Sequence, residues 1–364
     1  MFRICFLFLF AAFVAFDGYA QSKLNPVKIG LLISDKKAVA VKNGAELAIL
    51  QANDKGGYHG RPFELVVRSM EGPWGSGAKE AVKMIFDDEV CAIMGSTDGR
   101  NAHLVEQVTT KSRTVFLSVW AGDPTLSQAF VPWFFSCVTN NNQQASALVE
   151  EICQKQNLNP VGLVSDQEYD SQSGLKSFLK KNKMAGKPDP VQFSINNADQ
   201  DLVDLLNQMV KADLKAVVLF VKPGFALKII QQMQAKKMNF PVFSTLSVLN
   251  ENEVTSSEMK TMENRLQVTS CTWSKSRQIT FNNEFQRKYN SQPGTVATFA
   301  FDGMNLLIEA IKKGGFDREK IQKALSEIRY EGVTGLIQFD QKGNRSGTII
   351  LTPVKEHTPA IPEK

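Results

Sequence analysis

Residues 90–124 have the sequence VCAIMGSTDGRNAHLVEQVTTKSRTVFLSVWAGDP, which combines two apolar runs, two polar loops and one helical pattern. The apolar runs at residues 90–94 and 114–117 predict short buried strands. Residues 101–111 between them carry apolar side chains at helical spacing. A strand–helix–strand unit of this length predicts a parallel pair of strands with a right-handed crossover. We therefore expect an α/β fold built on parallel sheets.

The two polar loops of this stretch follow the two predicted strands. Both loops should lie beyond the carboxyl ends of neighbouring strands, where open α/β sheets bind ligands. Each loop also precedes a helix, whose free backbone N–H groups can hold a polar group. The alternative is that these are ordinary loops rich in turn-forming residues. We predict half of a ligand site here, at Ser96, Thr97, Asp98, Gly99, Ser118, Trp120, Ala121 and Gly122.

The N-terminus has the pattern of a secretory signal peptide. Arg3 precedes an apolar run at residues 4–16, and Ala20 then offers a small residue for cleavage. The alternative is a membrane anchor, but a helix that spans a bilayer needs about 20 apolar residues and this run is shorter. We expect residues 1–20 to be removed and the mature protein to be exported and soluble.

The composition is that of a globular protein and argues against nucleic-acid binding. The 364 residues are enough for two domains, and 43% hydrophobic with 22% charged residues is an ordinary balance. The formal net charge of +5 is modest, because 42 Lys and Arg are interspersed with 37 Asp and Glu. No basic stripe with interleaved aromatic residues is present, so we expect no nucleic-acid partner.

Cysteine and histidine spacing argues against a metal centre and against most enzymes. Four cysteines remain after the signal peptide, and four cysteines allow three disulfide pairings between which the sequence does not choose. We favour buried, unpaired thiols. No Cys-x-x-Cys or paired-histidine spacing is present, so no metal is expected. Because nucleophile elbows, phosphate loops and dinucleotide motifs are also absent, acid–base chemistry by Asp or Glu is the one enzymatic class left open, and no cofactor is expected.

A second motif extends the interpretation to the rest of the chain. Residues 53–61, NDKGGYHGR, have the pattern Asn-x-x-Gly-Gly-x-x-Gly-Arg between a predicted helix and a predicted strand. The paired glycines stop the helix, because Gly tolerates the left-handed conformation of a C-cap. With the Val-x-Ala-Ile-x-Gly pattern at residues 90–95, this order of elements resembles the type I periplasmic binding proteins of the leucine/isoleucine/valine-binding family, the solute receptors of ABC importers. The resemblance covers nearly the whole chain after the signal peptide.

The resemblance implies two doubly wound parallel-sheet lobes joined by a three-strand hinge, in a protein that we expect to be a monomer. The crossings are expected near residues 138–140, 268–271 and 332–334. The implied boundaries are 26–138 plus 272–331 for lobe 1, 139–270 plus 335–354 for lobe 2, and a flexible tail at 355–364.

The chain departs from the family at the side chains that hold an α-amino acid. Where the family's amino-acid receptors have a loop Ser, a Thr and an acidic residue, this sequence has Gly99, Gly122 and Leu246. The family's α-amino-acid clamp is therefore not expected here. Asp98 and Asp123 are alternative acidic partners, although Asp123 precedes a proline and equally predicts the start of a turn.

Four larger side chains are predicted to reach the cleft between the lobes. Tyr169 corresponds to the family's aromatic cleft residue. Lys222 stands where the family often has an aromatic residue, so it either holds an anionic ligand or is simply solvated. Trp74 and Trp120 lie in loops at the expected cleft, where a Trp either stacks on a ligand or covers a core. Trp273 is assigned to the hinge or the core.

These observations predict an exported, periplasmic solute-binding protein rather than an enzyme. It would capture a small polar molecule in the interlobe cleft and deliver it to the membrane permease of an ABC importer. The alternative partner is a membrane sensor that recognises a soluble, ligand-bound receptor. The ligand itself stays open, since amino acids, small amides and aromatic acids are all compatible with the sequence.

Overall fold

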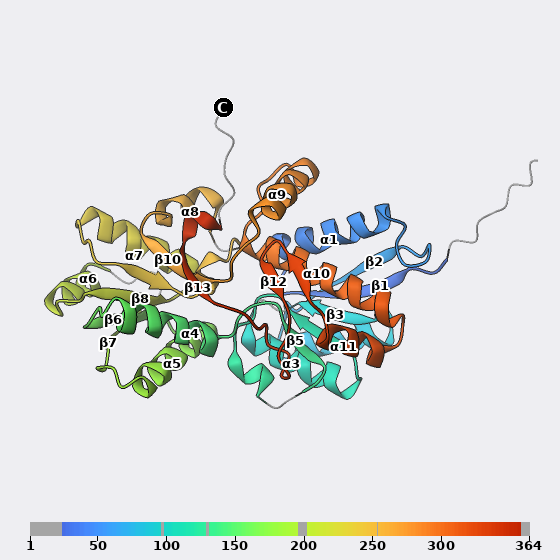
Figure 1. The fold of residues 1–364 in the computed structure, drawn as a ribbon, viewed down its shortest axis with the longest axis horizontal. Helices are drawn as coiled ribbons and strands as arrows, with labels where there is room; N and C mark the ends of the chain where they lie inside the picture. Colours follow the sequence, from blue (N-terminus) through green and yellow to red (C-terminus); the bar gives the residue numbers. More distant parts are fainter. Residues whose placement is uncertain (1–23, 96–97, 129–130, 196–201, 253, 358–364) are drawn as a thin grey trace, which may run out of the picture.

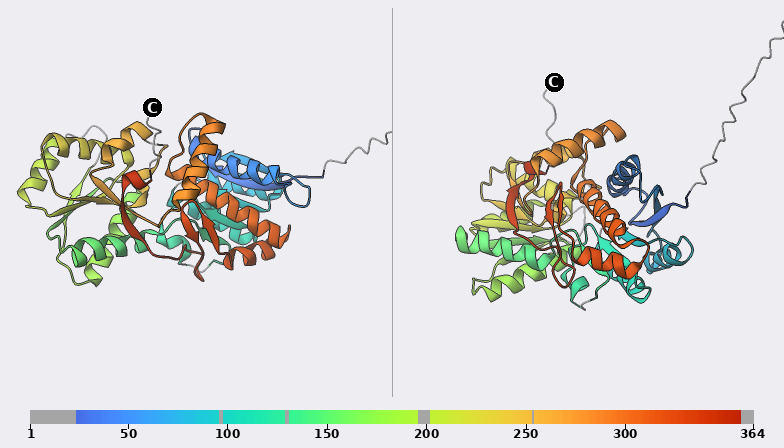
Figure 2. Two further views of the ribbon diagram at one scale, coloured as in Figure 1. Left: turned by 45° about the horizontal axis from the view of Figure 1, so that its top comes forward. Right: turned by 45° about the vertical axis from the view of Figure 1, so that its right-hand side comes forward.

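The computed structural model describes residues 24–357 except for 96–97, 129–130, 196–201 and 253. Figures 1 and 2 show two lobes lying side by side, each with helices packed around a twisted sheet. No helix in the described part of the chain is long and apolar enough to cross a membrane. The predicted signal peptide, Ser96 and Thr97 all lie outside the described residues.

Lobe 1 is built on a five-stranded parallel sheet with the strand order β2-β1-β3-β4-β5. The strands are β1 (Val27–Ile33), β2 (Phe63–Ser69), β3 (Ala92–Gly95), β4 (Val115–Ser118) and β5 (Phe134–Ser136). The helices of this lobe are α1 (Val39–Asp54), α2 (Ser76–Phe86), α3 (Gly99–Lys111), α9 (Lys275–Tyr289), α10 (Thr295–Gly314) and α11 (Arg318–Ser326).

Lobe 2 is built on a six-stranded sheet with the strand order β13-β10-β9-β8-β6-β7, in which only β13 is antiparallel. The strands are β6 (Val161–Ser165), β7 (Val191–Ser194), β8 (Ala216–Phe220), β9 (Val242–Ser244), β10 (Leu266–Ser270) and β13 (Ile350–Pro353). The helices are α4 (Asn141–Val149), which continues as the π-helix η2 (Glu150–Lys155), and α5 (Tyr169–Met184), α6 (Leu202–Lys211), α7 (Pro223–Ala235) and α8 (Ser256–Met262). The predicted architecture of two doubly wound lobes is confirmed.

The stretch from residue 90 to 124 forms β3, α3 and β4, followed by a 3-10 turn, η1 (Pro124–Ser127). β3 and β4 pair in parallel, with Ala92 opposite Val115. Their carboxyl ends therefore share one edge of the sheet, as predicted. The helix begins at Gly99 rather than at residue 101, because the Asp98 side chain accepts the backbone N–H of Asn101 and caps it.

The Asn53 motif joins α1 to β2 by side-chain hydrogen bonds. The Asn53 amide donates to the carbonyl oxygen of Phe63 over 2.9 Å and accepts the Phe63 N–H over 2.7 Å. Gly57 has φ +66°, and a Cβ there would collide with the carbonyl of Arg61. The motif thus fixes where the chain leaves the helix and enters the strand.

α10 is the central helix of lobe 1. Sixteen of its twenty residues are buried, and it packs against α1 and α11. The helices α1 and α10 approach closely, because a Cβ at Gly44 of α1 would collide with the carbonyl of Ala297. Gly303 similarly lets α10 lie against the loop after β4, since a Cβ there would stand 2.6 Å from the Val119 side chain.

Three segments connect the lobes, and the second and third lie later in the chain than predicted, because residues 268–270 belong to β10 in the sheet of lobe 2. The first two are residues 137–140, between β5 and α4, and residues 271–274, between β10 and α9. The predicted third crossing at 332–334 is wrong, because β11 (Tyr330–Gly332) and β12 (Gly335–Ile337) form a hairpin. The chain reaches lobe 2 only after residue 345, immediately before β13.

Buried polar contacts hold this hairpin on lobe 1. The carboxylate of Asp302 on α10 accepts the N–H groups of Val333 and Thr334 over 2.9 and 2.7 Å. The buried Arg345 donates to the carbonyl oxygens of Cys137 and Leu336, both over 3.0 Å. Residues 335–345, which the sequence assigned to lobe 2, therefore belong to lobe 1.

The end of the described chain is packed rather than extended away from the molecule. Residues 355–357 were predicted to belong to a flexible tail, but Val354–Glu356 form the 3-10 turn η4. His357 is 4% exposed, and its ring lies 4.8 Å from that of Trp273. The boundary predicted at residue 354 is therefore wrong, and residues 358–364 lie outside the described part. The four cysteines in the described part of the chain, Cys91, Cys137, Cys153 and Cys271, are free thiols.

Candidate functional site

A cavity of about 540 Å³ lies between the lobes. Its walls come from the loops after β1, β3 and β4 of lobe 1 and from the loops after β6, β8 and β9 of lobe 2. All six of these loops follow the carboxyl end of a parallel strand, the edge at which open α/β sheets place their ligand sites. The cavity therefore has the location predicted from the sequence and contributions from both lobes.

The structure brings four of the predicted site residues to this cavity, namely Asp98, Trp120, Tyr169 and Lys222. Gly122 lines a smaller neighbouring cavity of about 30 Å³, together with Leu246. Both cavities are bordered by Trp120. The smaller one contains two of the three positions at which this chain departs from the family's amino-acid clamp, and in this conformation it is too small for an amino acid.

The other four predicted residues that the structure describes, Gly99, Ser118, Ala121 and Trp74, do not line either cavity. Ser118 is fully buried, and its hydroxyl accepts the N–H of Ala121 over 3.2 Å. Ala121 is itself buried in an apolar cluster of lobe 1, so this pair shapes the loop. Trp74 is 70% exposed, and its ring contacts the guanidinium of Arg100 at 5.9 Å.

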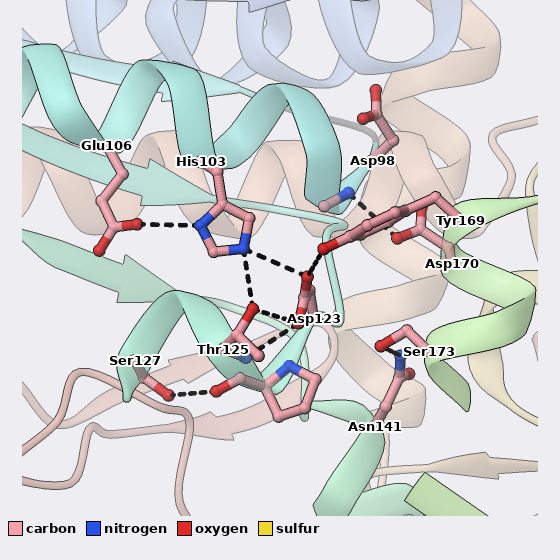
Figure 3. A network of polar contacts seen from close by, with 12 residues as sticks. Asp98, His103, Glu106, Asp123, Thr125, Ser127, Asn141, Tyr169, Asp170 and Ser173 are labelled. Carbon is pink, nitrogen blue, oxygen red and sulfur yellow. Dashed lines mark hydrogen bonds and ion pairs between the residues drawn. The ribbon is translucent and has the colours of Figure 1, made fainter. Parts of the chain in front are cut away.

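A polar network joins the lobes at the edge of the cavity (Figure 3). The hydroxyl of Tyr169, on α5 of lobe 2, donates to the Asp123 carboxylate of lobe 1 over 2.6 Å. Asp123 also accepts the N–H and the hydroxyl of Thr125 over 2.9 and 2.7 Å. His103 lies on the other side of this carboxylate, with its Nε2 3.3 Å from Asp123 Oδ2. Asp123 thus both starts the predicted turn and forms an interlobe contact.

Charges within this network are mutually stabilised. Burial alone would raise the pKa of Asp123, but hydrogen bonds from His103, Tyr169 and Thr125 outweigh it and hold this pKa well below its usual range. The contacts with Asp123 and Glu106 raise the pKa of His103 to about 9, so this histidine is a cation at neutral pH. Burial and the hydrogen bond to Asp123 raise the pKa of Tyr169 to about 12.

Two carboxylates of lobe 2 reach the N-termini of two helices of lobe 1. Asp170 accepts the N–H of Gly99, the first residue of α3, over 3.1 Å. A Cβ at Gly99 would stand 2.7 Å from Asp123 and 3.0 Å from Asp170, so glycine permits this approach. The second carboxylate, Glu251, accepts two N–H groups at the N-terminus of α10.

Glu251 accepts the N–H groups of Val296 and Ala297 over 2.7 Å each. Its carboxylate occupies the space in which a Cβ of Gly294 would stand. Burial raises the pKa of Glu251 to about 7, although the two N–H donors oppose the shift. Burial likewise raises the pKa of Asp170 to about 7, against the opposing effect of the Gly99 N–H.

Two cationic side chains lie at the cavity wall. Lys222 caps α7 without a side-chain hydrogen bond to it, and its ammonium lies 2.8 Å from Glu168. The guanidinium of Arg100, at the start of α3, lies 5.4 Å from the ring centroid of Tyr169 across the lobe boundary. Within the described residues, Arg100 forms no ion pair, which leaves its charge directed to two aromatic faces.

Sequence reasoning did not predict Arg100 and Asp170, which line the cavity, or Glu251, which forms hydrogen bonds between the lobes. Arg100 and Asp170 directly follow the predicted residues Gly99 and Tyr169, so their neighbours on the chain were a usable signal. Glu251 carries no such signal, because its partners lie 45 and 46 residues further along the chain.

Comparison with known proteins identifies the architecture. A family described as periplasmic binding protein matches residues 26–355. The Leu/Ile/Val-binding protein homolog 1 of Brucella melitensis is 22% identical over 342 residues, which cover 92% of this chain and 91% of that protein.

Solved structures of other proteins have a similar fold to this chain. The substrate-binding protein LivJ of Streptococcus pneumoniae, in complex with isoleucine, has a TM-score of 0.77 at 22% identity and covers 90% of this chain and 96% of its own. A solute-binding protein of R. palustris, in complex with benzoate, has a TM-score of 0.78 at 18% identity and covers 92% and 94%. The first is described as a branched-chain amino acid transporter substrate-binding protein, and the second as a solute-binding protein of an ABC transporter. The family match spans nearly all of the described residues, and the chain therefore belongs to the periplasmic binding protein family, with the two-lobed fold of type I.

Proposed function

We propose that this protein is an exported solute receptor that captures a small carboxylate in the interlobe cavity and delivers it to the membrane permease of an ABC importer. The observation that carries the proposal is the cavity of about 540 Å³ with walls from both lobes, next to hydrogen bonds that cross between them. A solute bound there would contact both lobes and favour their closure.

The chemistry of the wall supports a carboxylate as the ligand's polar group. Arg100 presents a planar guanidinium, which binds carboxylates in a bidentate geometry, and it forms no ion pair with a described residue. Trp120 offers an apolar surface for the rest of the ligand. Isoleucine and benzoate, the ligands of two relatives in fold, both carry a carboxylate.

An α-amino acid held in the family's usual way is less well supported. Gly122 and Leu246 replace the side chains of the clamp, and the cavity that they line measures only about 30 Å³. The N–H of Gly99 is already bonded to Asp170. We therefore favour carboxylates bound in the larger cavity, with aromatic acids as the first compounds to test.

The first experiment identifies the ligand without assuming its class. Protein purified from its own periplasm is denatured, and the released small molecules are identified by mass spectrometry. Thermal shift with benzoate, leucine and other carboxylates then ranks candidates, with a stabilisation of about 2.7 kcal/mol expected at a hundredfold excess over Kd. N-terminal sequencing of the same material should show a start near Gln21 or Ser22, and an intact Met1 would contradict export.

A substitution at Arg100 tests the proposed ligand class. Arg100→Ala should weaken binding of the identified ligand by about 2 kcal/mol, or roughly thirtyfold in Kd, because it removes the guanidinium from the wall. The control is Arg113→Ala, which removes an exposed arginine paired with Glu319 outside the cavity. Equal affinities of the two variants in calorimetric titration would refute a carboxylate held by Arg100. Uptake of the ligand by cells that lack the permease would refute delivery to an ABC importer.

A further inference from the structure

A further cavity, of about 400 Å³, lies within lobe 1 and shares no lining residue with the interlobe cavity. Its walls are α1, α9 and α10, which are labelled in Figure 1, and the β11–β12 hairpin. Gln51 and Lys55 come from the end of α1, and Arg277, Phe281 and Glu284 come from α9. Both sets have the spacing of residues on one helix face, so each helix presents a single face to the cavity. We call this cavity the lobe 1 pocket.

The lobe 1 pocket offers more positive than negative charge to a ligand. Lys55 and Arg277 are exposed, and within the described part of the chain neither side chain forms a hydrogen bond or an ion pair. The acidic side chains are Glu284, whose carboxylate accepts an amide hydrogen bond from α1, and Asp302. The Asp302 carboxylate is already held by three hydrogen bonds and by the charge of the buried Arg345. Two cations therefore face one remaining carboxylate, and the pocket favours a ligand with a negative charge.

Neutral hydrogen-bonding groups complete the lining of the lobe 1 pocket. The hydroxyl of Tyr330 has no partner among the described residues. Burial raises the pKa of Tyr330, although the charge of Arg277 opposes the shift, so this hydroxyl is a donor at neutral pH. The Asn305 amide donates to the carbonyl oxygen of Phe301 over 2.9 Å, which leaves its own oxygen as an acceptor. The rings of Phe281 and Phe301, with centroids 4.7 Å apart, form an apolar base beneath these polar groups.

This combination of groups indicates the class of ligand. A carboxylate matches the planar guanidinium of Arg277 and the ammonium of Lys55. Hydroxyl groups match the acceptors Glu284 and Asn305 and the donor Tyr330. The volume of about 400 Å³ lies within the range of small-molecule sites, which is about 300–1,000 Å³. A sugar acid combines these features, because it carries one carboxylate and several hydroxyl groups on a small carbon frame.

We propose that the lobe 1 pocket is a second binding site, for a sugar acid whose carboxylate is bound by Arg277 and Lys55. All of its walls belong to lobe 1, so the site is present in the open and closed forms and does not depend on the solute of the interlobe cavity. The pocket also adjoins the hinge, because the carbonyl of Val333 in its wall accepts the N–H of Ser274 over 2.9 Å. A molecule bound there would therefore lie beside the second connection between the lobes.

The test uses NMR of tyrosine rings, because each of the two cavities is lined by one tyrosine. Tyr330 lines the lobe 1 pocket and Tyr169 lines the interlobe cavity, among five tyrosines in the sequence. Mature protein with ¹³C-labelled tyrosine is titrated with sodium glucuronate to about 20 mM at constant ionic strength, because a ligand of this size binds in the millimolar range. Tyr330→Phe and Tyr169→Phe assign the two signals. Glucose, which lacks the carboxylate, and propionate, which lacks the hydroxyl groups, are the control compounds.

We expect glucuronate to shift the Tyr330 signal with saturation and to leave the Tyr169 signal unchanged. Arg277→Ala should weaken binding about tenfold, because it removes a charged hydrogen-bond donor. The matched control is Arg287→Ala, which removes an exposed arginine of the same helix that lines neither cavity, and it should bind as the wild type does. Glucose and propionate should each bind at least about fivefold more weakly than glucuronate.

Other outcomes would overturn the proposal. An unchanged Tyr330 signal would show that glucuronate does not enter the lobe 1 pocket, and a response of Tyr169 alone would place it in the interlobe cavity. Equal losses in Arg277→Ala and Arg287→Ala would indicate a general electrostatic attraction. Equal binding of propionate or glucose would exclude a sugar acid as the ligand class. Because the Tyr330 signal is observed in the wild-type protein, the test does not depend on the folding of a variant.

Discussion

Carboxylates buried inside lobe 1 and carboxylates buried between the lobes have different hydrogen-bond partners. Asp302 is fully buried within lobe 1 and accepts three hydrogen bonds, from two N–H groups and the hydroxyl of Thr334. Asp170 lies between the lobes and accepts one backbone N–H from the opposite lobe, and Glu251 accepts two. All of the partners of Asp302 stay beside it when the lobes separate, whereas those of Asp170 and Glu251 do not.

This difference separates groups that hold a lobe together from groups that set how easily the lobes part. A permanently buried charge needs a full set of donors, since removing them costs several kcal/mol. A carboxylate between the lobes regains water on opening, so a few donors suffice. Burial raises the pKa of Asp170, Glu251 and Asp302 alike, so the groups differ in where their donors lie and not in the direction of the pKa shift. The following predictions test that division.

The largest effect is expected inside lobe 1. Asp302→Ala leaves the N–H groups of Val333 and Thr334 buried without an acceptor and removes the nearby negative charge from the buried Arg345. We expect a loss of about 3 kcal/mol in the free energy of unfolding, measured in urea. Ligand affinity of the folded fraction should change by less than about twofold, as the interlobe contacts remain. A large loss of ligand affinity with unchanged stability would contradict this, because it would show that Asp302 affects the interlobe site rather than the stability of lobe 1.

The second effect is a dependence of ligand affinity on pH. Asp170 and Glu251 have pKa values of about 7 in this closed arrangement and return towards the usual value of about 4 when exposed to water. Closing therefore takes up protons, and the closed form is favoured as pH falls through 7. Between about pH 8 and pH 6, each carboxylate should strengthen binding by up to about tenfold.

The measurement is calorimetric titration at several pH values with a ligand whose own charge is constant over that range. Glu251→Gln should remove about half of the dependence on a logarithmic scale, because it leaves only Asp170 to titrate. Affinity that is constant from pH 6 to pH 8 would show that the two carboxylates keep their ordinary pKa values in the complex.

A third effect isolates one hydrogen bond across the lobes. Tyr169→Phe removes the donor to Asp123 and should weaken ligand binding by about 1.5 kcal/mol, or roughly tenfold, since hydrogen bonds to charged groups are the stronger ones. The control, Tyr289→Phe, removes a hydroxyl bonded to the carbonyl of Asn43 within lobe 1. It should lower the urea midpoint and leave affinity unchanged. If the two variants show the same changes in ligand affinity and in urea midpoint, then bonds between the lobes and bonds within a lobe do not differ in their effect on binding.

The smallest effect is expected at the exposed ion pair of Lys222 and Glu168. Their side chains are 45% and 55% exposed, so solvent screens the attraction. Lys222→Met should change affinity for a carboxylate by less than about threefold, and the change should shrink further in about 0.5 M salt. A loss as large as that of Arg100→Ala would show that Lys222, and not Arg100, holds the ligand.

Local patterns predicted much of the fold and the edge of the sheet that carries the cavity. The alternation of strand, loop and helix at residues 90–124 places Asp98 and Trp120 correctly, because parallel strands leave their loops no other edge. The Asn53 motif is equally local, since its hydrogen bonds reach only ten residues along the chain. In both cases the local backbone geometry determines where the loop lies, without contacts from distant parts of the chain.

The misassigned hinge crossing and the missed carboxylates depend on distant partners. The position of the β11–β12 hairpin on lobe 1 depends on side chains far from its turn. Asp302 lies 32 residues before Thr334, and Arg345 lies 11 residues after it. Asp170 meets Gly99 across 71 residues. A sequence pattern shows that such side chains are polar, but their partners become visible only when the lobes are assembled.

The burial of α10 has a consequence for the timescales of motion. This helix receives Glu251 at its first turn, packs Phe299 against two tryptophans and holds the β11–β12 hairpin through Asp302. Its interior amide protons can reach solvent only when lobe 1 unfolds, so their exchange should be among the slowest in the protein. Lobe separation, a microsecond-to-millisecond motion in proteins of this kind, would instead expose the N–H groups of Gly99, Val296 and Ala297. Amide exchange rates along α10 would therefore differ. The rates in its first turn would report the opening of the lobes, and the slower rates in the rest of the helix would report the unfolding of lobe 1.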